Sequence, residues 1–162
     1  MQTKTVLSGF TCIGQIEIPP VDEKFLAMEN FKKDDVLSYP HPMFLDFLEK
    51  HPVVKPRAGY SVSVYEPPKS CSSLQILKAF GRGICEVDLA AFRFLVYEAE
   101  KNKDQLSMKK NGNCNICVIS GTIVYCLGDD KLSVGITLPP FDSRPIWHHQ
   151  QLVFVRTKNV IE

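Results

Sequence analysis

Apolar and polar residues alternate in two stretches of the first half of the chain, and this alternation predicts strands. The first strand is expected in residues 4–18, and Pro19-Pro20 ends it. Its apolar side chains fall on even positions, namely Val6, Phe10, Cys12, Ile16 and Ile18. The second strand is expected in residues 60–64, before Pro67-Pro68. Prolines and paired aspartates interrupt residues 21–42, so we expect a loop there.

Two short helices are predicted from apolar residues at helical spacing. The first covers residues 42–51, with Pro42 at a favourable first position and Pro52 as the stop. The second covers residues 70–80 and ends at Gly81, which suits a left-handed helix cap.

Residues 88–103 carry two overlapping patterns. Read with a period of 3.6, they predict a helix with Asp88 as its N-cap. Read with a period of 2, residues 92–97 alternate, and their aromatic and β-branched content favours a strand. The sequence leaves both readings open.

The second half of the chain is rich in strand patterns. Residues 115–127 form an apolar run, interrupted by Ser120-Gly121-Thr122, in which odd and even positions are both apolar. A strand buried on two sides has this pattern. Residues 128–130 are expected to turn the chain so that residues 132–136 return as a hairpin partner. Residues 152–155 form the last predicted strand.

The composition is that of a soluble globular domain, with 162 residues of which 44% are hydrophobic and 23% charged. Lys and Arg number 19 against 18 Asp and Glu, so the net charge provides no attraction for nucleic acid or a membrane surface. No apolar run is long enough for a transmembrane helix, and residues 1–4 lack the layout of a signal peptide. We therefore expect one nuclear or cytoplasmic domain whose six cysteines are reduced.

Residue types that often carry catalysis occur without the spacing that would support it. Cys114 and Cys117 form a Cys-x-x-Cys pair, but on a strand they would point to opposite faces and could not bind one metal. The adjacent His148 and His149 diverge in the same way. Gly128-Asp129-Asp130 mimics the carboxylate hairpin of viral RNA polymerases but fits an ordinary turn. The sequence therefore predicts no enzyme, no catalytic residue, no metal ligand and no cofactor.

Residues 92–158 resemble a degenerate cupin barrel in the order and spacing of their elements. The matching elements are residues 94–97, 116–124, 132–135, 138–140 and 152–155. The likeness is greatest to the C-terminal dimerisation cupin of the inner-kinetochore CENP-C family. Metal-dependent cupins carry His and Glu ligands, whereas this chain has no histidine between His51 and His148.

The resemblance implies a non-enzymatic module that forms homodimers and recruits partner proteins at chromatin or the kinetochore. The expected fold is mainly β with a few short helices, a cupin-like jelly-roll barrel with an N-terminal extension; the alternatives are an α+β fold and an OB-like barrel. Residues 1–90 would be the β/α wrap, and residues 91–162 the β-barrel core. The expected homodimer interface lies on apolar strand faces, at Ile116, Val118, Val124, Tyr125, Val134 and Ile136.

Aromatic residues near the proline-rich connection 139–145 are the expected anchors for a partner protein of another kind. They are Phe141, Trp147 and Phe154. The alternative function is single-stranded nucleic-acid binding by an OB-like barrel. Its cationic residues would be Arg82, Lys109, Lys110, Arg144 and Arg156. No membrane partner is expected.

Overall fold

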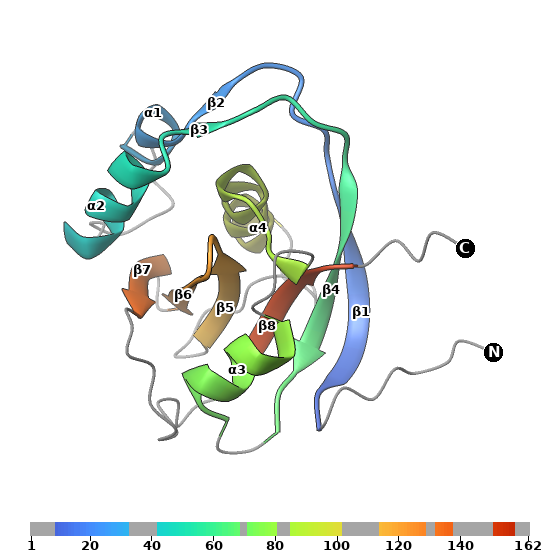
Figure 1. Cartoon of the computed structure of the whole chain (residues 1–162). Helices are drawn as coiled ribbons and strands as arrows, with labels where there is room; N and C mark the ends of the chain where they lie inside the picture. The colour runs from blue at the N-terminus through green and yellow to red at the C-terminus, as the bar shows by residue number, and fades with distance from the viewer. Residues whose placement is uncertain are drawn as a thin grey trace.

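The computed structural model describes residues 9–32, 42–68, 71–80, 85–101, 114–128, 132–137 and 151–157. Its main feature is a mixed six-stranded sheet in the order β1-β4-β8-β5-β6-β7 (Figure 1). The strands are β1 (Thr11–Ile18), β4 (Tyr60–Glu66), β5 (Cys114–Ile119), β6 (Thr122–Gly128), β7 (Leu132–Thr137) and β8 (Gln151–Arg156). Neighbours are antiparallel except β8 and β5, which are parallel. The expected class, mainly β with short helices, is confirmed, whereas no pairing among the described strands closes a barrel.

Helices cover both faces of the sheet (Figure 1). On one face, α1 (Ala27–Lys32), α2 (Pro42–Lys50) and α4 (Leu89–Lys101) contribute to the larger apolar cluster. On the other face, α3 (Ser73–Phe80) packs in a smaller cluster. We call these the α4 face and the α3 face.

A narrow two-stranded connection, which we call the arch, leads from the sheet to α1 and α2 (Figure 1). It consists of residues 19–26 and 53–59 and includes β2 (Phe25–Leu26) and β3 (Val53–Val54). Val21 and Arg57 pair within it through two backbone hydrogen bonds of 2.9 Å. The loop expected at residues 21–42 is therefore corrected over its described part, because this pairing and the burial of Phe31 order it.

The open choice at residues 88–103 is decided in favour of a helix. Asp88 is the N-cap of α4, since its Oδ1 accepts the Ala91 N–H at 2.8 Å. Phe92, Leu95 and Val96 then face the sheet and are fully or almost fully buried. The cupin resemblance needs a strand around residues 94–97, and these residues lie in α4.

The run of residues 115–127 is two strands rather than one. A tight turn at Ser120 and Gly121, which both have positive φ, joins β5 to β6. Since Val118 pairs with Ile123 across this hairpin, odd positions of β5 share a face with even positions of β6. One continuous strand would place all odd positions of residues 115–127 on one face. Beyond the turn this expectation is wrong, because the faces of odd and even positions are exchanged.

The strands do not divide at residue 90. β1 and β4 come from the first 90 residues, and β4 pairs directly with β8 near the end of the chain. The strand pairing therefore does not follow the expected division into a wrap or extension and a β-barrel core. The helices predicted at residues 42–51 and 70–80, and the β6–β7 hairpin, are confirmed.

Candidate functional site

The residues expected to form a dimer interface are covered by the chain itself. Ile116, Val118 and Tyr125 lie on the α3 face, in the cluster that contains Ile76 and Phe80 of α3. On the α4 face, the larger cluster contains the remaining three, Val124, Val134 and Ile136. Five of the six are buried, and Tyr125 is partly buried. These faces are therefore not free for a second subunit in this fold.

Of the three aromatic residues expected to anchor a partner protein, the structure describes one, Phe154. Phe154 is corrected: it is fully buried in the cluster on the α4 face, because β8 lies between β4 and β5 in the sheet. Phe141 and Trp147 lie outside the described residues. Of the cationic residues expected for nucleic-acid binding, Arg156 is described, and Arg82, Lys109, Lys110 and Arg144 are not.

The three cysteines of β5 and β6, Cys114, Cys117 and Cys126, are buried thiols. Cys114 and Cys117 point to opposite faces of β5, as predicted, and cannot bind one metal together. Burial raises the pKa of the Cys114 thiol to about 12 and that of Cys71 to about 11. All six cysteines are free. Within the described part of the chain, no three His, Cys, Asp or Glu side chains come together as a metal site.

The outer edge of β1 is a candidate binding surface, because β1 is the terminal strand of the sheet. β1 pairs with β4 on one side and with no described residue on the other. At the opposite end of the sheet, α2 packs against β7. An unpaired strand edge offers a row of backbone N–H and C=O groups to another strand.

The direction of the backbone groups in β1 follows from the neighbouring ladder. The Ser61 C=O accepts the Thr157 N–H at 2.8 Å, so the backbone groups of Ser61 point toward β8. Because these directions alternate along a strand, the backbone N–H and C=O groups of Tyr60 and Val62 point toward β1. The backbone groups of their partners in β1, Ile18 and Ile16, therefore point toward β4. Glu17 lies between Ile16 and Ile18, and Gln15 precedes Ile16. The N–H and C=O groups of Gln15 and Glu17 therefore point away from β4.

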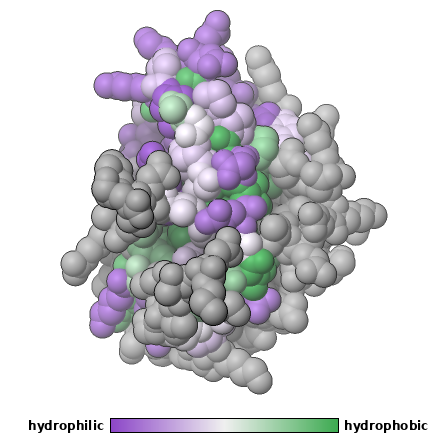
Figure 2. Space-filling view, turned by 90° about the vertical axis from the view of Figure 1, so that its right-hand side faces the viewer, coloured by the Kyte–Doolittle hydropathy of each residue, from purple (hydrophilic) through white to green (hydrophobic). Residues whose placement is uncertain are grey.

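Only part of β1 is shaped to accept a strand. Ile13 has no partner of its own in β4, which places a bulge between Cys12 and Gly14. Residues 14–18 form a regular ladder after it. Gln15 and Glu17 lie on the α3 face, where Gln15 Nε2 donates to Ser63 Oγ at 3.5 Å and Glu17 accepts from Ser61 Oγ. Figure 2 views the molecule from the side on which β1 lies and shows mixed hydrophilic and hydrophobic residues rather than one apolar patch.

A charged joint fixes the arch to the start of α4. The Arg57 guanidinium donates to both carboxylate oxygens of Asp88, with Nη2 at 3.0 Å from Oδ1. Arg57 Nη1 also donates to the backbone oxygens of Pro19 and Ala58. The Tyr60 ring lies beneath this guanidinium at 4.5 Å and contacts that of Arg156 at 4.4 Å. Burial is the main reason that the pKa of Tyr60 rises to about 12.

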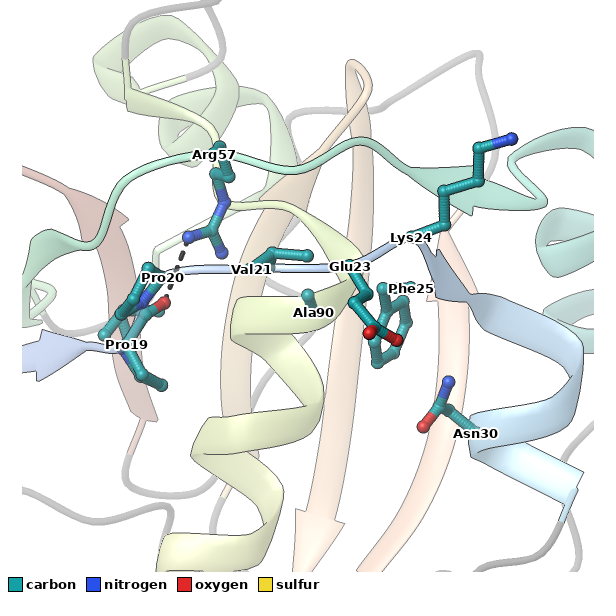
Figure 3. Close-up of a pocket in the computed structure, with 10 residues that line it drawn as sticks. Pro19, Pro20, Val21, Glu23, Lys24, Phe25, Asn30, Arg57 and Ala90 are labelled. Carbon is teal, nitrogen blue, oxygen red and sulfur yellow. Dashed lines mark hydrogen bonds between the residues drawn. The ribbon is translucent and has the colours of Figure 1, made fainter.

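A hollow of about 320 Å³ lies between the arch and the first turn of α4 (Figure 3). Its lining includes Glu23, Lys24, Arg57 and Ala90. Figure 3 shows Lys24 pointing away from Ala90 and the Glu23 side chain extending beside Phe25. The Arg57 guanidinium is already bound to Asp88 and Pro19, and the remaining charges are of opposite sign. This lining selects no ligand class by charge.

No family model matches the chain, and neither a curated protein nor a solved structure matches it. No helix in the described ranges has the length and apolar character needed to span a membrane. The sequence contains no signal that locates this edge, because alternating polar residues in a strand indicate a solvated face and not an unpaired edge.

Proposed function

We propose that this chain is a protein-interaction module that binds an extended segment of a protein by strand addition at residues 14–18 of β1. The observation that supports the proposal is the outward direction of the Gln15 and Glu17 backbone groups, with no described residue paired to them. Strand addition is a recurrent mode of peptide recognition, in which main-chain hydrogen bonds provide affinity. The role keeps the interaction function expected from the sequence and moves it from the strand faces to an edge.

The short edge sets the strength of binding. Two outward residues offer two N–H and two C=O groups, and each hydrogen bond is worth about 0.5–1.5 kcal/mol net. The four bonds contribute about 2–6 kcal/mol, which corresponds to dissociation constants weaker than micromolar before side chains contribute. The module would therefore bind partners reversibly.

Selection of random linear peptides displayed on phage tests this function. The wild-type chain is immobilised sparsely, so that self-association does not occupy the edge. Gln15→Pro removes an outward N–H without removing a bond to β4, as proline does on edge strands. Gln15→Ala, the matched control, keeps the N–H.

Selected peptides should bind the proline variant about two- to ten-fold more weakly than wild type, and the alanine variant as well as wild type. Circular dichroism melting should show that the proline variant is folded. Failure to enrich any peptide, or equal binding to the proline variant, would count against strand addition at β1.

A further inference from the structure

We infer that a second copy of this chain is a partner of the β1 edge, paired antiparallel about a two-fold axis through Ile16. This inference rests on the proposed function, since it assumes that residues 14–18 accept a strand. A two-fold interface brings the same surface together from both copies, so the edge must be complementary to itself.

Hydrogen bonding limits how two copies of β1 can align. Outward N–H and C=O groups must face outward groups of the other strand, and in residues 14–18 these belong to Gln15 and Glu17. Three symmetric alignments satisfy this condition, with the axis at Gln15, at Ile16 or at Glu17.

Two of the three alignments bring unsuitable residues together. With the axis at Gln15, Glu17 faces Ile13 of the other copy, which lies in the bulge and cannot continue a regular ladder. With the axis at Glu17, the two Glu17 carboxylates face each other, and Gln15 faces Pro19, which has no N–H.

The alignment about Ile16 avoids all of these conflicts. Each Gln15 faces Glu17 of the other copy as a hydrogen-bonded pair, so all outward backbone groups are used. Both side chains lie on the α3 face, where the Gln15 amide can donate to the other copy's carboxylate. On the opposite face Ile16 meets Ile16 of the other copy, and each is now only partly buried. We call this interface between the two β1 strands the seam. On each of its faces, residues of like polarity meet.

The present contacts of these side chains leave capacity for the seam. Among the described residues, the Gln15 amide is bonded to Ser63 Oγ alone, at the long distance of 3.5 Å. The Glu17 carboxylate accepts from Ser61 Oγ through Oε1, and a carboxylate has several more lone pairs to offer. Neither side chain has to break a short bond to a buried group.

Site-specific cross-linking tests the partner and the alignment together. Cys12 and Cys85 are the two cysteines that are only partly buried, so both are first replaced by serine. Ile16→Cys would then place two thiols opposite each other at the axis, within reach of a disulfide. Gln15→Cys alone, or Glu17→Cys alone, would place its thiols on diagonal positions about 7–8 Å apart, beyond easy reach.

Under mild oxidation the Ile16→Cys chain should form covalent dimers, and an equal mixture of Gln15→Cys and Glu17→Cys chains should cross-link more than either alone. Preferential cross-linking of Gln15→Cys or Glu17→Cys by itself would overturn this alignment. No cross-linking, together with a monomer by light scattering up to about 1 mM, would overturn the second copy as partner. In that case peptide binding at β1 would still uphold the proposed function, and loss of both would refute the two together.

Charge substitution provides an independent measure. In Gln15→Lys each lysine would face one Glu17 carboxylate, which makes two ion pairs per dimer and tightens it, whereas Gln15→Glu would weaken it, each by about two- to thirty-fold. Glu49→Gln and Lys50→Gln change the net charge equally on exposed positions of α2 and should leave the dimer unchanged. Sedimentation equilibrium at low and high salt checks this, and both effects should shrink as salt screens the seam. Equal affinities for the Lys and Glu variants at low salt would overturn the Gln15–Glu17 pairing.

Discussion

The joint between Arg57 and Asp88 makes a testable contribution to stability, because Asp88 performs two separable tasks. Its Oδ1 caps α4 by accepting the Ala91 N–H, and its two oxygens together accept from the Arg57 guanidinium. Asp88→Ala removes both tasks. Asp88→Ser keeps a capping oxygen and removes the charge, so the difference between the two variants isolates the cap.

The size of each contribution follows from the geometry. Loss of an N-cap to alanine costs about 0.5–2 kcal/mol. The ion pair is two-pronged but partly exposed, with side-chain exposures of 18% for Arg57 and 27% for Asp88. It therefore falls between exposed pairs and buried charged hydrogen bonds, at about 1–2 kcal/mol. We expect losses in the free energy of unfolding of about 2–3 kcal/mol for Asp88→Ala and about 1–2 kcal/mol for Asp88→Ser.

Urea unfolding of a double-mutant cycle measures the pair directly. The cycle combines Asp88→Ser with Arg57→Gln, and the expected coupling is about 1–2 kcal/mol at an unchanged denaturant slope. Arg57→Gln alone should cost more than the coupling, because Arg57 also donates to Pro19 and Ala58. A coupling below about 0.5 kcal/mol, the usual error of additivity, would refute the reasoning that this pair ties the arch to α4.

Three further predictions concern stability and are checked by chemical denaturation. Gly59→Ala would place a Cβ 2.6 Å from the Ile18 backbone oxygen and should lower the free energy of unfolding by about 1–3 kcal/mol. A neutral effect would contradict the close approach of the backbone at Gly59 to the end of β1. Gly135→Ala would place a Cβ 2.5 Å from the Tyr125 ring, and its cost should fall when Tyr125→Ala is already present. Burial raises the Cys114 pKa from 9.0 to about 12, so the fold holds its proton more tightly than the unfolded chain does. This stabilisation is complete below about pH 9 and is lost as the pH rises toward 12; Cys114→Ala should flatten that decline, and an equally steep decline would contradict it.

The sequence predicted strands and helices best where a single periodicity was present. The alternation in residues 60–64 and the helical spacing in residues 42–51 both correspond to observed elements. At residues 88–103 local propensity supported two answers, and the structure shows what decides between them. Asp88 caps a helix whose apolar side, including Phe92, fills the α4 face of the sheet. That face is built by strands far away in the chain, and no local pattern contains them.

The dimer interface expected on the strand faces is covered by helices of the same chain, for a related physical reason. A strand with two apolar faces predicts that both faces are covered but does not say by what. Here α3 supplies Ile76 and Phe80 against one face of β5, and α4 supplies Leu95 and Val96 to the cluster on the other. Two amphipathic helices in the same chain each need an apolar surface, and a central strand pair provides one on each side. Counting such helices against apolar strand faces would have favoured internal cover over a second subunit.

The side-chain pattern of β1 does not reveal its free edge, because the hydrogen-bonding groups of that edge belong to the backbone. Gln15 and Glu17 are ordinary polar residues on a strand, and their side chains alone indicate only a solvated face. Their outward N–H and C=O groups become evident once the Thr157–Ser61 hydrogen bond fixes the direction of the ladder. The bulge at Ile13 and the prolines after Ile18 then confine any added strand to residues 14–18. An edge bounded in this way would limit both the alignment and the affinity of the proposed partner strand, which suits an association that responds to concentration rather than a permanent one.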